Sequence, residues 1–162
     1  MKQNSTVKEQ SLNPQPAART QTQPHVAADV EKCDDKLDER ICTALHAASE
    51  KKAIEPVVLD LRDIASFTDY FVICSGANER QVQAISDEVS ETLKKAGEPA
   101  IRVEGYKTAE WILLDYGDFV VHVFEQKARK FFDLERLWRE SKRVELPAEL
   151  TGEGPSSLRK ES

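Results

Sequence analysis

Two kinds of hydrophobic spacing alternate along the chain and predict a domain of mixed helices and strands. Apolar residues that recur at three- and four-residue steps predict amphipathic helices over 30–52, 78–96 and 126–140. Shorter apolar runs predict strands over 57–61, 69–74, 101–103, 111–115 and 119–124. The element order is α-β-β-α-β-β-β-α, which indicates the α/β (α+β) class with a five-stranded mixed sheet packed with helices.

Turn and cap residues refine this pattern. Asn78 is placed to cap the second helix, and Gly97 is placed to end it. The strand–helix–strand segment over 69–103 predicts a right-handed parallel crossover. The last three strands predict an antiparallel meander, with a tight turn at 116–118.

The two ends of the chain differ from its middle in composition. Residues 1–28 contain three prolines and few large apolar side chains, so we expect a disordered tail. Residues 148–162 contain two glycines, a proline and two adjacent serines and predict a second disordered tail, which leaves a folded domain over 29–147. No secretory or membrane-spanning apolar segment is visible, which favours a cytoplasmic protein without membrane contact.

The charge balance favours a protein partner. The formal net charge of the chain is −6, and residues 33–147 alone contain 23 acidic and 17 basic residues. An acidic domain suits a basic protein and does not favour the phosphate backbone, so we expect no direct sequence-specific nucleic-acid binding.

Residues that could hold a metal or a cofactor are sparse. The three cysteines lack CxxC spacing, which argues against both a zinc site and a disulfide framework. The three histidines are scattered, so the sequence predicts no metal, no cofactor and no catalytic residue. A strand that ends in Ser75-Gly76 before a helix could hold an anion, as in nucleotidyltransferases. Those enzymes need paired carboxylates for two metal ions, and only Asp60, Asp115 and Asp118 could serve.

Aromatic and charged residues on the predicted meander are the candidate partner-binding surface. Trp111, Leu113 and Asp115 alternate along one strand and therefore share a face, with an apolar anchor beside a charge. The alternative is that Trp111 only packs against the final helix. The full predicted surface consists of Tyr70, Tyr106, Lys107, Trp111, Leu113, Asp115, Asp118 and His122.

A series of motifs between Asp60 and Val144 resembles the ribosomal silencing factor family (RsfS, also called Iojap). The matching segments are TDYFVICSG at 68–76, RQVQAI at 80–85, EG at 104–105, WILLDYGDFVVHVF at 111–124 and RKFFDLERLW at 129–138. Their order and spacing make the resemblance specific, although each segment alone is weak. One departure is Phe132, where the family usually has Tyr.

The resemblance implies a nucleotidyltransferase-like fold without the catalytic carboxylates, and a binding protein rather than an enzyme. It implies docking on large-subunit ribosomal protein fourteen, which blocks joining with the small subunit and represses translation under nutrient limitation. An assembly factor for the large subunit needs the same docking surface and stays an alternative. A nucleotidyltransferase-type enzyme is a further alternative, and a homodimer is compatible with the same surface.

Overall fold

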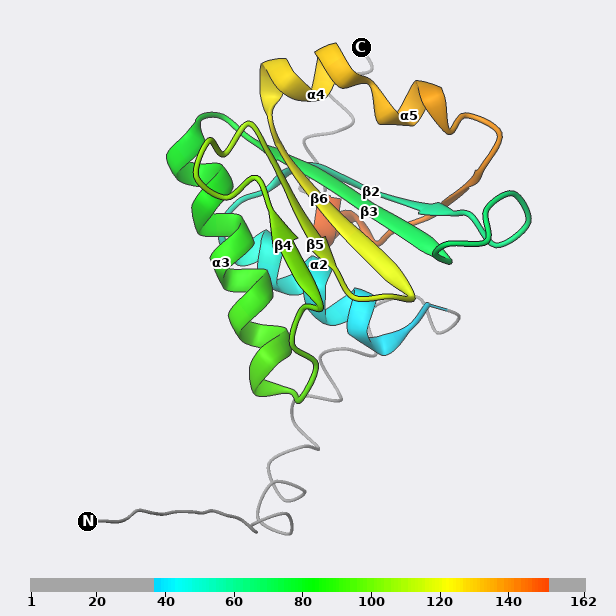
Figure 1. Cartoon of the computed structure of the whole chain (residues 1–162), viewed down its shortest axis with the longest axis horizontal. Helices are drawn as coiled ribbons and strands as arrows, with labels where there is room; N and C mark the ends of the chain where they lie inside the picture. Colours follow the sequence, from blue (N-terminus) through cyan, green and yellow to red (C-terminus); the bar gives the residue numbers. More distant parts are fainter. Residues whose placement is uncertain (1–36, 152–162) are drawn as a thin grey trace, which may run out of the picture.

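A computed structural model describes residues 37–151 of the chain, and all structural statements below concern these residues. Its strands are β2 (Ile54–Asp60), β3 (Tyr70–Gly76), β4 (Arg102–Glu104), β5 (Trp111–Asp115), β6 (Phe119–Glu125) and β7 (Lys142–Val144). Its helices are α2 (Glu39–Glu50), α3 (Glu79–Lys95), α4 (Gln126–Phe132), α5 (Leu134–Leu137) and α6 (Ala148–Thr151) (Figure 1). The first helix was predicted over 30–52, but α2 begins only at Glu39, because Asp38 has a non-helical backbone and caps it. The predicted helical residues before 37 lie outside the described part.

The strands form one mixed sheet in the order β4-β5-β6-β3-β2-β7. The predicted fold class is confirmed, with six strands instead of five. The missed strand, β7, pairs antiparallel with β2 through Val144, Arg143 and Lys142. A three-residue edge strand with two exposed cations carries no hydrophobic alternation, so its sequence gives no strand signal.

The predicted parallel crossover from β3 through α3 to β4 joins two strands that run in the same direction but are not neighbours in the sheet. The antiparallel meander of β4, β5 and β6 is confirmed. The parallel neighbour of β3 is β6, however, and β4 lies at the far edge of the sheet. Two strands, β5 and β6, therefore lie between the strands that α3 connects.

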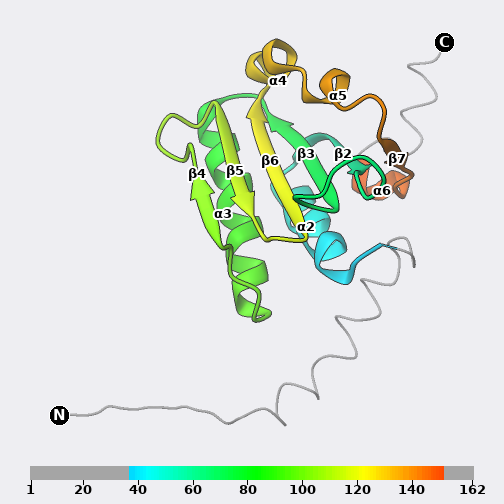
Figure 2. The ribbon, with the colours of Figure 1, turned by 45° about the vertical axis from the view of Figure 1, so that its right-hand side comes forward.

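Helices α2 and α3 cover one face of the sheet (Figures 1 and 2). Between them and the sheet lies the larger hydrophobic core, which includes Ile41 and Leu45 of α2, Val82 and Ile85 of α3, and Ile112 of β5. The opposite face carries a smaller core cluster that contains Phe71, Ile73 and Phe124. We call this second side the open face, because neither α2 nor α3 packs on it.

The predicted final helix is broken. Asp133 has φ +50° and ends α4, and the short helix α5 starts at the next residue. An aspartate tolerates the left-handed conformation better than most residues, but the hydrophobic pattern does not reveal it. The break changes the helical phase. Leu134 is buried as predicted, whereas Phe131, predicted on the same stripe, is 81% exposed.

The C-terminal boundary and one cysteine also differ from expectation. Residues 148–151 form α6, and Leu150 is buried in the larger core, so the ordered chain continues past the predicted end at 147. Cys42 is disulfide-bonded, contrary to the expectation from the cysteine spacing. Cys74 is a free thiol, and burial raises its pKa to about 12. No helix within 37–151 is long and apolar enough to cross a bilayer.

Gly105 is a position where a side chain cannot be tolerated. Its φ is +81°, and a Cβ there would lie 2.1 Å from the carbonyl oxygen of Trp111. We expect Gly105→Ala to lower the free energy of unfolding by about 1–3 kcal/mol, because it combines backbone strain with this clash. Gly97→Ala is the matched control, since Gly97 has φ +88° but open space around it. Chemical denaturation of both variants should show the larger loss for Gly105→Ala, and equal losses would contradict the role of the clash.

Candidate protein-binding surface

The strand register brings part of the predicted surface together on the open face. Leu113 pairs with His122, and Trp111 pairs with Phe124 on the neighbouring strand. Trp111, Leu113 and Asp115 alternate with the fully buried Ile112 and Leu114, which point toward α3. The predicted alignment of these three residues on one face is therefore confirmed, and His122 lies on the same face between β5 and β3.

Trp111 lies in a row of aromatic rings that runs from the core to the surface. Its ring centroid is 4.9 Å from that of the fully buried Phe124 and 4.8 Å from that of Phe132 in α4. Phe132 is 43% exposed and Trp111 is partly exposed. The packing of Trp111 against the final helix, considered as an alternative above, thus coexists with exposure. We call Trp111, Leu113 and Phe132 the aromatic patch.

A hydrogen bond to the buried His122 fixes the position of the Trp111 indole. The indole Nε1–H of Trp111 donates to Nδ1 of His122 at 3.0 Å. Because Nδ1 accepts this bond, the neutral ring carries its proton on Nε2, which is buried and has no hydrogen-bond partner among the described residues. His122 is only 3% exposed, so it supports the patch and cannot itself form much of a contact surface.

Burial of His122 makes folding sensitive to acid. It lowers the pKa of the imidazole to about 3, whereas an unfolded chain has a histidine pKa near 6.5. Between these values the unfolded state binds the extra proton. The free energy of unfolding should therefore decrease as the pH is lowered, by up to about 1.4 kcal/mol per pH unit. We expect this slope in denaturation between pH 6.5 and 4.5, and its loss in His122→Phe. A slope that His122→Phe leaves unchanged would assign the effect to other groups.

The two predicted rim carboxylates are already engaged within the domain. Asp115 accepts a hydrogen bond from the backbone N–H of Gly117 at 2.9 Å and forms an ion pair with Arg102 at 3.2 Å. Asp118 lies in the β5–β6 turn, and its carboxylate contacts Arg40 of α2 at 2.8 Å. Asp115 therefore borders the open face, whereas Asp118 is directed to the α2 side.

Three predicted surface residues lie elsewhere. Tyr70 is 9% exposed and packs in the larger core, on the face that α2 and α3 cover, so its assignment beside Trp111 is wrong. Tyr70 lies in β3, where every residue is buried. Buried and exposed residues therefore do not alternate, and the sequence pattern cannot show which face of the sheet Tyr70 occupies. Tyr106 and Lys107 lie in the β4–β5 connection. The Tyr106 hydroxyl donates to Asp87 of α3 at 3.1 Å, away from the aromatic patch.

Several exposed apolar residues next to the open face were not predicted from the sequence. Phe132 is the last residue of α4 and packs against Trp111. Phe67 is 60% exposed in the β2–β3 connection, and its ring centroid is 5.9 Å from that of Trp138. Leu137 is 69% exposed on α5. The paired phenylalanines at 131–132 were the available signal, but the predicted helical stripe used Phe131, which is 81% exposed.

The carboxylates that the enzyme alternative needs do not converge. Asp60 lies on the sheet face of Val58, under α2, whereas Asp115 lies on the open face. Asp60 is bound by Arg62 at 2.8 Å, which holds the pKa of its carboxyl below the ordinary value. Within the described residues, no group of three or more His, Cys, Asp or Glu side chains could hold a metal ion.

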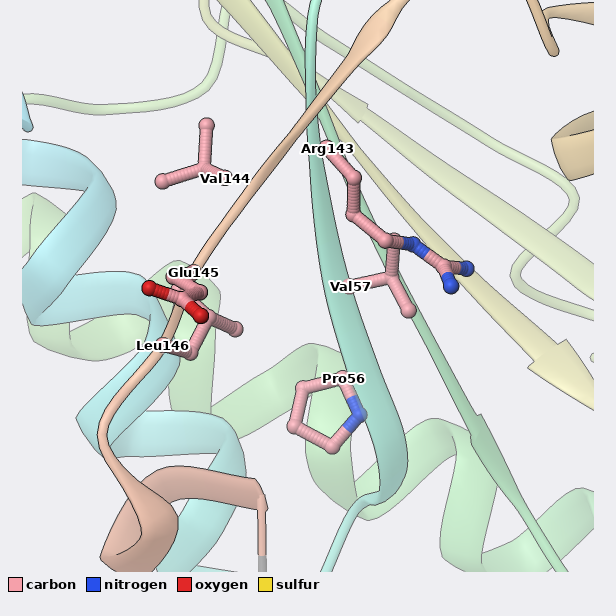
Figure 3. A pocket seen from close by; sticks show the side chains of 6 residues that line it. All are labelled: Pro56, Val57, Arg143, Val144, Glu145 and Leu146. Carbon is pink, nitrogen blue, oxygen red and sulfur yellow. The ribbon is translucent and has the colours of Figure 1, made fainter.

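A small cavity of about 290 Å³ lies at the other edge of the sheet, between β2 and the chain after β7. Figure 3 shows the guanidinium of Arg143 directed away from Glu145. That guanidinium contacts Glu135 at 3.1 Å. The lining offers no cluster of polar groups that converge on a ligand. It consists of Pro56, Val57, Arg143, Val144, Glu145 and Leu146.

The fold and the aromatic patch define an α+β domain with one partly uncovered, apolar sheet face. A family model described as "Ribosomal silencing factor during starvation" matches residues 34–161. This match covers more than half of the chain and places it in a class of ribosome-associated regulatory proteins. The chain belongs to the ribosomal silencing factor family.

Individual relatives agree with this assignment. Ribosomal silencing factor RsfS of Halalkalibacterium halodurans is 43% identical over 103 residues, which cover 64% of this chain and 88% of the relative. The Bacillus subtilis protein of the same name is 38% identical over 103 residues, or 64% of this chain and 87% of the relative. A crystal structure from Chromobacterium violaceum superposes with a TM-score of 0.61 at 31% identity, covering 67% of this chain and 89% of that one.

Proposed function

We propose that this protein binds the large ribosomal subunit through the open face and prevents it from joining the small subunit. The docking partner is large-subunit ribosomal protein fourteen, and the outcome is repression of translation under nutrient limitation, in the cytoplasm. The mechanism is steric occlusion, which needs no chemical turnover. The family match over residues 34–161 carries this proposal.

The chemistry of the aromatic patch supports protein docking. Trp111 and Phe132 present large apolar rings at one end of β5, and the paired charges of Asp115 and Arg102 lie at its other end. Buried aromatic anchors with a charged rim are typical of the energetic centre of protein interfaces. The net charge of −6 also suits a basic ribosomal protein.

Co-sedimentation tests the docking step. Purified protein is mixed separately with large and small subunits and centrifuged through sucrose. We expect the protein to travel with the large subunit and to compete with a soluble fragment of the large subunit's protein fourteen. Equal distribution over both subunits, or no sedimentation with either, would refute the proposal.

A role in assembly of the large subunit is the second candidate. A mouse relative named Mitochondrial assembly of ribosomal large subunit protein 1 is 29% identical over 92 residues, covering 55% of this chain and 40% of the mouse protein. The two roles predict different particles. An assembly factor would travel with precursor particles in growing cells, whereas a silencing factor would travel with mature large subunits in starved cells. A homodimer through the open face would compete with either role, and sedimentation equilibrium would reveal it.

A further inference from the structure

Charge is distributed unevenly over this acidic chain. Residues 126–143, which form α4, α5 and the start of β7, contain seven basic and three acidic residues. The whole chain contains 23 basic and 29 acidic residues. Figures 1 and 2 both show α4 and α5 side by side at one end of the sheet. The cations of α4 and α5 therefore lie at one end of the domain.

Internal ion pairs occupy only part of this positive charge. Arg129 and Arg143 both contact Glu135, at 3.0 and 3.1 Å, and Lys142 contacts Asp63 at 3.4 Å. The other four cations are exposed and form no ion pair with any carboxylate within residues 37–151. We call these four the basic ridge: Lys127, Lys130, Arg136 and Arg139.

An exposed aromatic side chain lies among these cations. Lys127, Lys130 and Phe131 are three and four residues apart on α4 and so share a helical face. Phe131 is 81% exposed, and its ring meets that of Phe132 edge-on at a centroid distance of 5.1 Å. Arg136 and Arg139 both follow the break at Asp133. The guanidinium of Arg139 donates to the carbonyl oxygen of Arg136 at 3.4 Å, which keeps these two cations adjacent.

We propose that the basic ridge binds RNA, with its cations on phosphates and Phe131 stacked on an unpaired base. Flexible lysines suit phosphates and are depleted at protein interfaces, so this surface fits nucleic acid better than a second protein. Cations interleaved with an exposed aromatic ring are typical of sequence-independent binding to single strands. The inference rests on the proposed function in one respect, because a factor docked on the large subunit would meet ribosomal RNA beside its protein partner.

Fluorescence anisotropy with the full chain and a labelled single-stranded RNA of mixed sequence tests the ridge. Four phosphate contacts predict that log K falls with log salt concentration with a slope of about −2.8 between 50 and 200 mM KCl. We expect Lys127→Glu combined with Lys130→Glu to weaken binding at least about tenfold and to reduce the slope by about 1.4. Lys51→Glu combined with Lys52→Glu makes the same charge change at two exposed lysines beyond α2 and should leave affinity nearly unchanged.

If both double variants weaken RNA binding equally, only the net charge of the protein matters, and the proposed role of the basic ridge is overturned. Absence of salt-dependent RNA binding, or binding to phosphatidylserine vesicles without binding to RNA, would overturn it as well. The same variants are assayed against isolated large-subunit ribosomal protein fourteen. If the unmodified chain binds that protein but not RNA, only the RNA-binding role of the basic ridge is refuted. If the unmodified chain does not bind that protein, the proposed docking is refuted.

Discussion

Replacing Trp111 with alanine is expected to weaken binding to the large subunit by about 2–4 kcal/mol, or about 30- to 700-fold. The indole is partly exposed at the centre of the aromatic patch, packed at tilted angles between Phe124 and Phe132 and fixed by its hydrogen bond to His122. A ring that is held in place before binding loses little conformational entropy when a partner covers it. Binding isotherms with purified large subunits, and circular dichroism of the variant, measure the effect.

The same substitution also removes internal packing, so a control must separate stability from binding. The chain's other tryptophan, Trp138, is also partly buried and contacts Phe67 and Phe71 instead of the aromatic patch. We expect Trp138→Ala to destabilise the fold to a similar degree and to weaken binding much less. Similar binding losses in both variants would show that the interface is not centred on Trp111.

Removing Arg129 is expected to have the largest effect on stability, about 3–5 kcal/mol for Arg129→Met. Arg129 is 8% exposed, and its guanidinium donates to the carbonyl oxygen of Ile54, to the hydroxyl of Ser75 and to both carboxylate oxygens of Glu135. These bonds tie α4 to the ends of β2 and β3 and to α5. Without the arginine, a half-buried carboxylate and a backbone carbonyl lose their donor. Urea denaturation measures the loss.

Arg62→Met is the matched control for this prediction. Arg62 forms a similar two-point contact with Asp60, at 3.0 and 2.8 Å, but its side chain is 59% exposed. Solvent screens that pair, so we expect little change in stability. Arg129→Lys should restore only part of the loss, because an ammonium group cannot donate in all these directions. If Arg129→Met proves as mild as Arg62→Met, the buried network does not hold α4 in place.

Local alternation was enough to predict the aromatic patch in part. It placed Trp111, Leu113 and Asp115 on one face because the strand between Trp111 and Asp115 is buried on one side only. Where a strand is buried on both sides, as β3 is, the same reasoning cannot assign a face, and Tyr70 was placed wrongly. Phe132 was missed because the predicted helical stripe assigned Phe131 to the buried side, whereas Phe131 is 81% exposed. The break at the left-handed Asp133, which sets the phase of α5, is encoded by no hydrophobic period.

Strand order was also beyond the reach of the sequence pattern. The meander followed from short turns, but a crossover helix fixes only that two strands can run parallel and leaves open how many strands lie between them. The insertion of β5 and β6 between β4 and β3 depends on tertiary packing over α3. It is this insertion that brings β6 beside β3 and leads the chain into α4 next to Trp111.

Subunit joining is the measurement that tests the proposed silencing role most directly. Purified small and large subunits are mixed with excess protein in buffer with magnesium and separated on a sucrose gradient. We predict a loss of joined ribosomes, with the protein in the large-subunit peak, and restored joining when Trp111→Ala replaces the unmodified chain. Undiminished joining while the protein saturates the large subunit would contradict occlusion.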